Sequence, residues 1–382
     1  MKTPRMISLL WSMAFVMLAL VLFTASIFYP VRWTGSAKTF QQLMDGWSSQ
    51  ARVPGVLLRV NINNETVFSS ASGSTQRWGQ GRPLRAEDRF HMASIGKLFT
   101  AVAALRLCER GLLDLDARVA ELLGPEIVKG LVVMDGKDQG AKITVRHLLN
   151  HTAGFGNTDD NFGIQLGIMF KPDERRTPLT LIDQARRVPP VGFPGHQQHY
   201  SSAGYFLLGL VLEKVSSLPY HEVVRREILV PLNLSSTHES THEWKRSDEE
   251  LHHYVGLVEL WKVDPSFEYA DGGFVTTTDD LARFGQALMS GAVFEQPQTL
   301  SIMTNLPITK KPLNPSSQFG LGIGVEKDPQ GDKMFYHLGF FGCGLVMVPS
   351  TQTVIVYALG QSAADIELFQ KQVLELSRPQ IR

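Results

Sequence analysis

The sequence predicts an α+β fold, in which segments from both ends of the folded region form one antiparallel sheet flanked by helices, around a mainly helical inserted subdomain. Three observations support this prediction. β-rich segments lie within residues 56–71 and 333–359, and the region between them repeats apolar residues at helical spacing. No internal repeat or biased tract follows residue 40, which favours one domain over residues 41–378. An apolar segment at residues 7–29 predicts an N-terminal transmembrane helix before that domain.

The apolar segment at residues 7–29 has no charged side chain. As a helix it would be about 35 Å long, which is enough to cross a hydrocarbon layer of about 30 Å. Two basic residues stand on each side of it: Lys2, Arg5, Arg32 and Lys38. We expect a cytoplasmic tail (1–6), a retained signal anchor in the inner, cytoplasmic membrane (7–29), and a linker (30–40) leading to a periplasmic or extracellular domain.

A cleaved signal peptide is the alternative interpretation of the same segment. The apolar run of residues 7–29 is longer than the core of a typical signal peptide, and no A-x-A-like cleavage site ends it. These two features favour the retained anchor over cleavage.

The composition excludes several classes of protein. Of the 382 residues, 43% are hydrophobic and 19% are charged, which excludes a disordered or low-complexity chain. Lysine plus arginine and aspartate plus glutamate both number 37, so we expect no large basic surface and no nucleic-acid partner. The chain has two cysteines, Cys108 and Cys343, which exclude a disulfide framework.

The expected strands lie near the two ends of the domain. Residues 56–61 and 65–71 are predicted to form a hairpin joined by Ile62, Asn63 and Asn64, because asparagine tolerates the turn conformation. Three more strands and a final helix are predicted at residues 333–336, 343–348, 353–359 and 363–376.

The expected helices lie between these strands. Apolar residues recur at helical spacing in four segments, residues 97–110, 146–149, 203–215 and 279–289. Gly111 is predicted to end the first of these helices, and Thr278 to cap the last.

The tetrad Ser94-Ile95-Gly96-Lys97 opens the first helix of this region and pairs a hydroxyl with an amine. The spacing of three places both side chains on one helix face. A partly buried lysine with neighbouring cations has a lowered pKa and can accept the serine proton, while a helix N-terminus favours developing negative charge. The motif alone is weak, because a serine N-cap beside a solvated lysine gives the same sequence.

Two later motifs strengthen the interpretation. Tyr200-Ser201-Ser202 and His337-Leu338-Gly339 follow in the order of the second and third motifs of the serine β-lactamase and penicillin-binding protein superfamily. Four longer blocks resemble its class C β-lactamase-like branch, which includes DD-peptidases, D-aminopeptidases and esterases: residues 90–123, 143–154, 194–213 and 271–291. The resemblance implies a β-lactamase/transpeptidase-like fold.

The resemblance also implies roles for individual residues. Ser94 would be the acylated nucleophile, Lys97 its proton partner and Tyr200 the phenol that assists proton transfer at the leaving group. Backbone N–H groups of Ser94 and Phe340 would hold the oxyanion. Substrate-binding roles would fall to three residues, with Gly339 allowing close approach of the substrate: Ser202, His337 and Gly339. No cofactor and no metal are expected.

Two departures from the family motifs bear on the substrate. Ser202 stands where the family usually has asparagine, and His337-Leu338-Gly339 replaces Lys-Thr-Gly. Leu338 cannot bind a carboxylate, and a histidine with a pKa of about 6.5 is partly cationic at pH 7. We therefore expect a small-molecule or peptide ester or amide as substrate, cleaved by an esterase, D-aminopeptidase or peptidase-like enzyme, and no efficient β-lactamase. The alternative is a weak or inactive penicillin-binding-like pseudoenzyme that serves as a cell-wall or protein-binding module.

One metal motif is set aside. Residues 238–242 match H-E-x-x-H, but their surroundings predict a loop in place of the helix that a zinc site of this type requires. Cys108 is expected to be buried and inert, and Cys343 has no thiolate-stabilising neighbour in the sequence.

Overall fold

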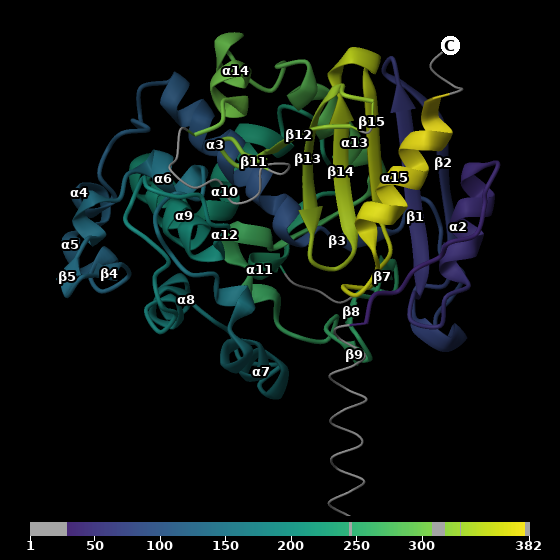
Figure 1. Cartoon of the computed structure of the whole chain (residues 1–382), viewed down its shortest axis with the longest axis horizontal. Helices are drawn as coiled ribbons and strands as arrows, with labels where there is room; N and C mark the ends of the chain where they lie inside the picture. Colours follow the sequence, from purple (N-terminus) through teal and green to yellow (C-terminus); the bar gives the residue numbers. More distant parts are fainter. Residues whose placement is uncertain (1–28, 244–246, 308–317, 329, 379–382) are drawn as a thin grey trace, which may run out of the picture.

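The computed structural model describes residues 29–243, 247–307, 318–328 and 330–378. A seven-stranded sheet with the order β11-β12-β13-β14-β15-β1-β2 forms its centre, and every neighbouring pair of strands is antiparallel (Figure 1). The strands are β1 (Gly55–Ile62), β2 (Glu65–Gly73), β11 (Gln318–Phe319), β12 (Gly324–Lys327), β13 (Lys333–Gly339), β14 (Cys343–Val348) and β15 (Thr353–Ala358). The expected α+β fold is confirmed.

The sheet joins the two ends of the domain, as expected. Strand β1 pairs with β15 and, through a tight hairpin, with β2. Asn63 and Asn64 form the hairpin turn with φ of 52° and 65°, the left-handed conformation that a two-residue turn of this kind needs at both positions. Ile62 belongs to β1, so the loop is one residue shorter than expected.

Strand β13 is longer than the predicted segment at residues 333–336 and includes His337, Leu338 and Gly339. Pairing with β12 ends at Tyr336, whereas pairing with β14 continues to Gly339. The third motif therefore lies on a strand end that is paired on one side, where backbone groups remain available to a ligand.

Two helices cover one face of the sheet, α2 (Phe40–Ser48) and α15 (Ile366–Ser377) (Figure 1). Trp47 packs edge-to-face on Phe369, with ring centres 5.6 Å apart. Val31 is buried and pairs with Ala364, so part of the predicted linker packs against the domain.

The opposite face of the sheet packs against the inserted subdomain, with α13 (Thr278–Met289) in contact with β1, β14 and β15. The other longer helices of the subdomain are α3 (Gly96–Glu109), α7 (Phe162–Phe170), α8 (Pro178–Ala185) and α9 (Ser202–Ser216). The helices expected at residues 97–110, 203–215 and 279–289 are confirmed to within one residue. The cap of α13 is Thr277 and not Thr278, because the Thr277 hydroxyl accepts the Asp280 N–H.

Shorter elements complete the described chain. They are β3 (Arg89–His91), α4 (Val119–Leu123), α5 (Pro125–Val128), β4 (Val133–Met134), β5 (Lys137–Asp138), α6 (Val145–Leu149), α10 (Tyr220–Val224), β6 (His238–Glu239), α11 (Ser240–Glu243), β7 (Glu250–Leu251), β8 (Tyr254–Val255), β9 (Val258–Glu259), α12 (Tyr269–Gly272), β10 (Phe274–Thr276) and α14 (Gln298–Thr304). Strands β6, β10, β3 and β7 form a second, small sheet.

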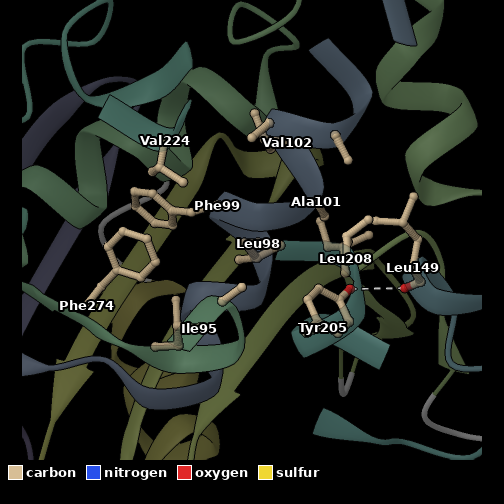
Figure 2. Packing of buried hydrophobic residues seen from close by; sticks show 14 of the residues in the cluster. Ile95, Leu98, Phe99, Ala101, Val102, Leu149, Tyr205, Leu208, Val224 and Phe274 are labelled. Carbon is tan, nitrogen blue, oxygen red and sulfur yellow. Dashed lines mark hydrogen bonds between the residues drawn. The ribbon is translucent and has the colours of Figure 1, made fainter. Parts of the chain in front are cut away.

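Helix α3 runs through the main hydrophobic core. Its residues Leu98, Phe99, Ala101 and Val102 are fully buried among side chains from neighbouring elements (Figure 2). The hydroxyl of Tyr205 on α9 donates to the Leu149 carbonyl oxygen at 3.0 Å, beside this helix (Figure 2). Because α3 is packed on nearly all sides, it holds the residues at its N-terminal end in fixed positions.

The predicted signal anchor, residues 7–29, lies outside the described residues except for Tyr29. Within the described ranges, none of the helices combines the length and the apolar character needed to cross a membrane.

Candidate active site

Ser94 lies in a short 3-10 turn, Ala93–Ile95, immediately before α3. Ala93 has a φ of 45°, a left-handed conformation that is uncommon for a residue with a side chain. Such strained residues cluster at functional sites, where the surrounding structure holds them in place. Ser94 is half-buried and lines a cavity. The strained turn therefore presents its hydroxyl to a possible ligand.

The ammonium group of Lys97 lies at the centre of the site and is fully buried. Its Nζ donates to Ser94 Oγ at 3.1 Å and to Ser202 Oγ at 3.4 Å. It also forms an ion pair with Asp271 Oδ2 at 3.0 Å. The structure thus brings together Ser94, Lys97 and Ser202, as the motifs predicted.

The charge state of Lys97 differs from the expected one. Burial favours the neutral amine, but Asp271, with smaller contributions from Tyr200 and Asp159, outweighs burial and raises the pKa of Lys97 above its usual value. The sequence interpretation, a pKa lowered by neighbouring cations, is wrong because the partner in contact is a carboxylate. Lys97 is therefore an ammonium ion at neutral pH.

Asp271 is a site residue to which the sequence assigned no role. It lies on α12, a short helix whose backbone packs against the nucleophile turn. A Cβ atom on Gly272 would lie 2.8 Å from the carbonyl carbon of Ala93, so glycine is required for this close approach. The approach brings Asp271 within reach of Lys97, 174 residues away in the chain.

Two further acidic residues surround the same lysine. Ser202 Oγ donates to Asp159 Oδ2 at 2.8 Å. Asp159 as a residue is exposed, but its carboxylate group is surrounded by protein atoms. The loss of water around the carboxylate, and the nearby Asp271 carboxylate, raise the pKa of Asp159 to about 6. The positive charge of Lys97 acts in the opposite direction. Glu268 is 6% exposed, and burial, with Asp271, raises its pKa well above the usual value.

Tyr200 lies against Lys97 from the other side. The Lys97 Nζ is 4.9 Å from the centre of the Tyr200 ring, and the ring of His151 packs on Tyr200 at 4.4 Å. The Tyr200 hydroxyl has no hydrogen-bond partner of good geometry in the described part of the chain. Burial raises the pKa of Tyr200. Lys97 and Ser94 lie close enough to the hydroxyl to reduce this rise.

His337 on β13 faces this cluster as a neutral ring. Its Nδ1 donates to the Leu338 carbonyl oxygen at 3.0 Å. Burial, with a smaller contribution from the nearby Lys97 charge, lowers the pKa of His337 to about 3. The expected partial positive charge at pH 7 is therefore wrong.

Leu338 does not face the cavity. Along β13, Phe335 belongs to the core on the side of α3, whereas Tyr336 and Leu338 pack with the cluster beneath α2 and α15. Side chains alternate along a strand, so Leu338 points away from the side that His337 occupies. The sequence suggested that leucine at position 338 removes a hydroxyl that would otherwise bind a substrate carboxylate. Because the side chain faces away from the cavity, this interpretation is wrong.

Gly339 positions the end of β13 beside the nucleophile turn. A Cβ atom at this position would lie 2.5 Å from the Met92 carbonyl oxygen. The sequence suggested that Gly339 lets a substrate approach closely. In the structure, the glycine instead allows the end of β13 to contact the backbone at Met92. Phe340 follows it, with a side chain 52% exposed, and lines the same cavity as Ser94.

The cavity above Ser94 has a volume of about 390 Å³. The polar residues that line it are Ser94, Asp159, Asp160, Gln165, Glu268 and Asp271. Its walls are mainly apolar and include Leu166, Ile168 and Met169 from α7, together with Val255, Leu260, Phe340 and Phe341. Such a combination of apolar walls and a few convergent polar groups is typical of small-molecule sites.

Comparison with known proteins agrees with this geometry. A family model described as Beta-lactamase matches residues 37–365. The chain belongs to the Beta-lactamase family. The resemblance seen in the motifs is thereby confirmed.

Proteins with several different names are similar to this chain in structure or in sequence. A D-stereospecific amidohydrolase from Streptomyces sp. matches with a TM-score of 0.75 and 26% identity, over 87% of this chain and 96% of that chain. Esterase EstB from Burkholderia gladioli is 31% identical over 224 residues, which cover 55% of this chain and 54% of the esterase. A penicillin-binding protein from Bacillus subtilis is 25% identical over 68% of this chain and 57% of its own length. The chain thus spans a little over half of these two curated relatives.

The H-E-x-x-H segment of this family member is not a loop, contrary to expectation. His238 and Glu239 lie in β6, and residues 240–243 form α11. Glu239 accepts the backbone N–H groups of Thr241 and His242 at 3.2 Å and 3.0 Å, so it stabilises the start of this short helix. A search of the described residues finds no group of three or more side chains arranged to hold a metal ion.

Neither cysteine is among the residues that line the cavity beside Ser94. Burial raises the pKa of Cys108 to about 12, and burial also raises the pKa of Cys343. The Cys343 thiol contacts the Met92 carbonyl oxygen at 3.4 Å. Both side chains are therefore thiols and poor nucleophiles at neutral pH.

Proposed function

We propose that this chain is a serine hydrolase that cleaves an ester or amide through an acyl-enzyme on Ser94. The observation that carries the proposal is the 3.1 Å contact between Ser94 Oγ and Lys97 Nζ, with Ser94 lining a largely apolar cavity. A hydroxyl in hydrogen-bond contact with a group that can take its proton is the usual arrangement of an activated nucleophile. Membership of the Beta-lactamase family, with relatives named as an esterase and an amidohydrolase, supports the same reaction class.

The ion pair of Lys97 determines the proton route that we propose. An ammonium ion cannot accept a proton unless it releases one, and the acceptor in contact is Asp271 Oδ2 at 3.0 Å. Ser94 Oγ attacks the carbonyl carbon while its proton moves to Lys97 and a Lys97 proton moves to Asp271. The bond to the leaving group then breaks as that proton returns through Lys97 and Tyr200 to the departing oxygen or nitrogen. Water repeats the sequence on the acyl-enzyme, which releases the acid and restores Ser94.

The charge of the site favours substrates without an essential carboxylate. His337 is neutral, and Lys97, the ammonium group at the centre of the site, is already paired with Asp271. A substrate carboxylate would therefore have to compete with Asp271 for this ammonium, which costs free energy. An esterase or amidase is therefore the better fit, and an efficient β-lactamase the poorer one.

We also propose that residues 7–29 anchor the enzyme in the inner membrane, with the catalytic domain outside the cytoplasm. Support comes from the length of this uncharged apolar segment. The full-length protein should stay with membranes in high salt, because burial of apolar side chains is not weakened by screening. Release by salt alone, or an N-terminus cut near Ser26, would argue against the anchor.

Hydrolysis of 4-nitrophenyl butyrate, followed beside acylation by a penicillin, tests the proposed activity. The wild type should turn over the ester and react slowly with the penicillin. Ser94→Ala should abolish ester turnover and leave the melting temperature nearly unchanged, because the hydroxyl of Ser94 contributes little to the core. Equal ester turnover in the two proteins would reject the proposal.

A further inference from the structure

We propose that helix α7 and the turn between β8 and β9 lie on the surface of the lipid bilayer in which residues 7–29 are anchored. The inference rests on the proposed anchor and is independent of the proposed reaction. It assigns a lipid partner to one end of the catalytic domain, where α7, β8 and β9 lie together (Figure 1).

Helix α7 is more apolar than its position in the fold requires. Apart from Gln165, every residue of this helix is apolar or glycine, yet within this fully described helix only Ile168 is buried. The side chains of Phe162 and Phe170 are 61% and 80% exposed. Apolar surface in water costs about 25 cal/mol per Å², so an exposed helix of this composition indicates a partner that covers it.

The β8–β9 hairpin continues this apolar surface. Val255 of β8 and Ile168 of α7 belong to one buried cluster, and Val258 of β9 packs against it. Leu257, in the turn between the two strands, is 46% exposed. The exposed apolar side chains of α7 and of the hairpin therefore belong to elements that pack directly on each other.

An exposed tryptophan lies beside the same hairpin. The guanidinium carbon of Arg77 is 4.4 Å from the ring centre of Trp78 and 4.5 Å from that of Tyr254 in β8. Arg77 Nη1 also donates to the Gly256 carbonyl oxygen in the hairpin turn. The Trp78 side chain is exposed. Tryptophan is enriched where proteins meet the headgroup region of a bilayer, so its presence here favours a lipid partner.

The start of the described chain lies at this end of the domain. The Val31 N–H donates to the Ala363 carbonyl oxygen at 2.6 Å, and the Tyr254 N–H donates to the Gly360 carbonyl oxygen at 3.0 Å. Residues 360–364 therefore join the first packed residue of the domain to strand β8.

This position leaves no spacer between the bilayer and the domain. Val31 is buried in the domain, and Pro30 alone separates it from Tyr29, the last residue of the uncharged apolar segment. Two residue steps of extended chain span at most about 7 Å. A bilayer that holds residues 7–29 therefore lies against the end of the domain that carries α7 and the hairpin. With nine residues, α7 is too short to cross the bilayer and would lie along its surface.

Quenching by a labelled lipid tests this contact in the full-length protein. Phe170→Cys, in a Cys108→Ala background, is labelled with a nitrobenzoxadiazole probe, since the remaining thiol of Cys343 is buried. The protein is reconstituted in phosphatidylcholine vesicles, with or without a phosphatidylcholine that carries a nitroxide near the top of an acyl chain. An interfacial helix lies about 5 to 10 Å into this region, so the nitroxide should lower the emission at residue 170 about twofold or more.

The matched control is Ile302→Cys in the same background. Ile302 is also an exposed apolar residue on a helix, but its helix, α14, lies at the opposite end of the domain from α7 (Figure 1). The nitroxide lipid should lower the emission of a probe at residue 302 only slightly.

The outcomes separate the lipid contact from the anchor. Protein that floats with the vesicles but shows equally weak quenching at residues 170 and 302 would overturn the contact and leave the anchor intact. A probe at residue 170 whose emission shifts to the blue without nitroxide quenching would mean that a second copy or residues 7–28 cover α7, which also overturns the contact. Quenching at residue 170 in a chain whose N-terminus is cut near Ser26 would reject the anchor and support the lipid surface.

Discussion

The two sides of Ser94 differ sharply in charge. On the sheet side, β13 presents the neutral ring of His337 and the backbone around Gly339. On the helical side, the carboxyl groups of Asp159, Glu268 and Asp271 gather around Lys97. The sheet side therefore suits an uncharged carbonyl, whereas the helical side suits proton transfer. This asymmetry explains both the proton route and the proposed substrate.

The largest expected effect concerns the helical side. Asp271→Asn removes the proposed final proton acceptor and leaves Lys97 without its ionic partner. We expect kcat/KM for an ester to fall about 100-fold or more at pH 7, the range typical for loss of a general base.

The pH profile of Asp271→Asn shows whether Asp271 acts in this way. Without Asp271 the pKa of Lys97 falls, so more of the amine is neutral as the pH rises, and activity should recover partly above pH 8. If neutral Lys97 alone were the base, the variant would be faster than the wild type at pH 7. A faster variant would therefore contradict the relay through Asp271.

An intermediate effect concerns the sheet side. The pKa of His337 is about 3 in the folded protein and about 6.5 when unfolded, so the unfolded state binds more protons between these values. Stability from the neutral ring is present above pH 6.5 and lost as the pH falls towards 3. From pH 7 to 5, the free energy of unfolding should fall by about 2 kcal/mol more in the wild type than in His337→Asn. Denaturant titrations that give equal pH dependences would show that His337 is not buried as a neutral ring.

The smallest effect concerns Leu338. Because its side chain packs beneath α2 and α15, Leu338→Thr should lower stability by about 1 kcal/mol through lost apolar burial. The rate of acylation by a penicillin should change less than a few-fold, since the new hydroxyl does not face the cavity. A rise of tenfold or more would mean that residue 338 contacts the substrate.

Local patterns explain how much of the fold could be predicted. The hairpin at Asn63 and Asn64, the C-terminal strands and helix α3 follow from periodicity and turn chemistry, which act between neighbours in sequence. Ser94, Lys97 and Tyr200 were found because each lies in a short motif. The alternation of side chains along β13 was a signal that could have placed Leu338 opposite His337.

The charge of the site could not be predicted in the same way. The contact between Lys97 and Asp271 joins segments 174 residues apart, and nothing next to either residue in sequence announces it. Glu268 shares a turn with Asp271, yet its burial depends on how that turn packs against the nucleophile. Sequence motifs therefore predicted the candidate reacting groups, and the folded structure was needed to infer which of these groups carry a proton.

The most direct test of the central claim is intact-mass analysis after treatment with an alkyl fluorophosphonate. The reagent forms a bond to an activated serine oxygen and releases fluoride, so each active site gains one adduct. We predict one adduct per wild-type chain, mapped by peptide analysis to Ser94, and none in Ser94→Ala. Labelling that persists in Ser94→Ala, or folded wild-type protein that gains no adduct, would contradict the assignment of Ser94 as the nucleophile.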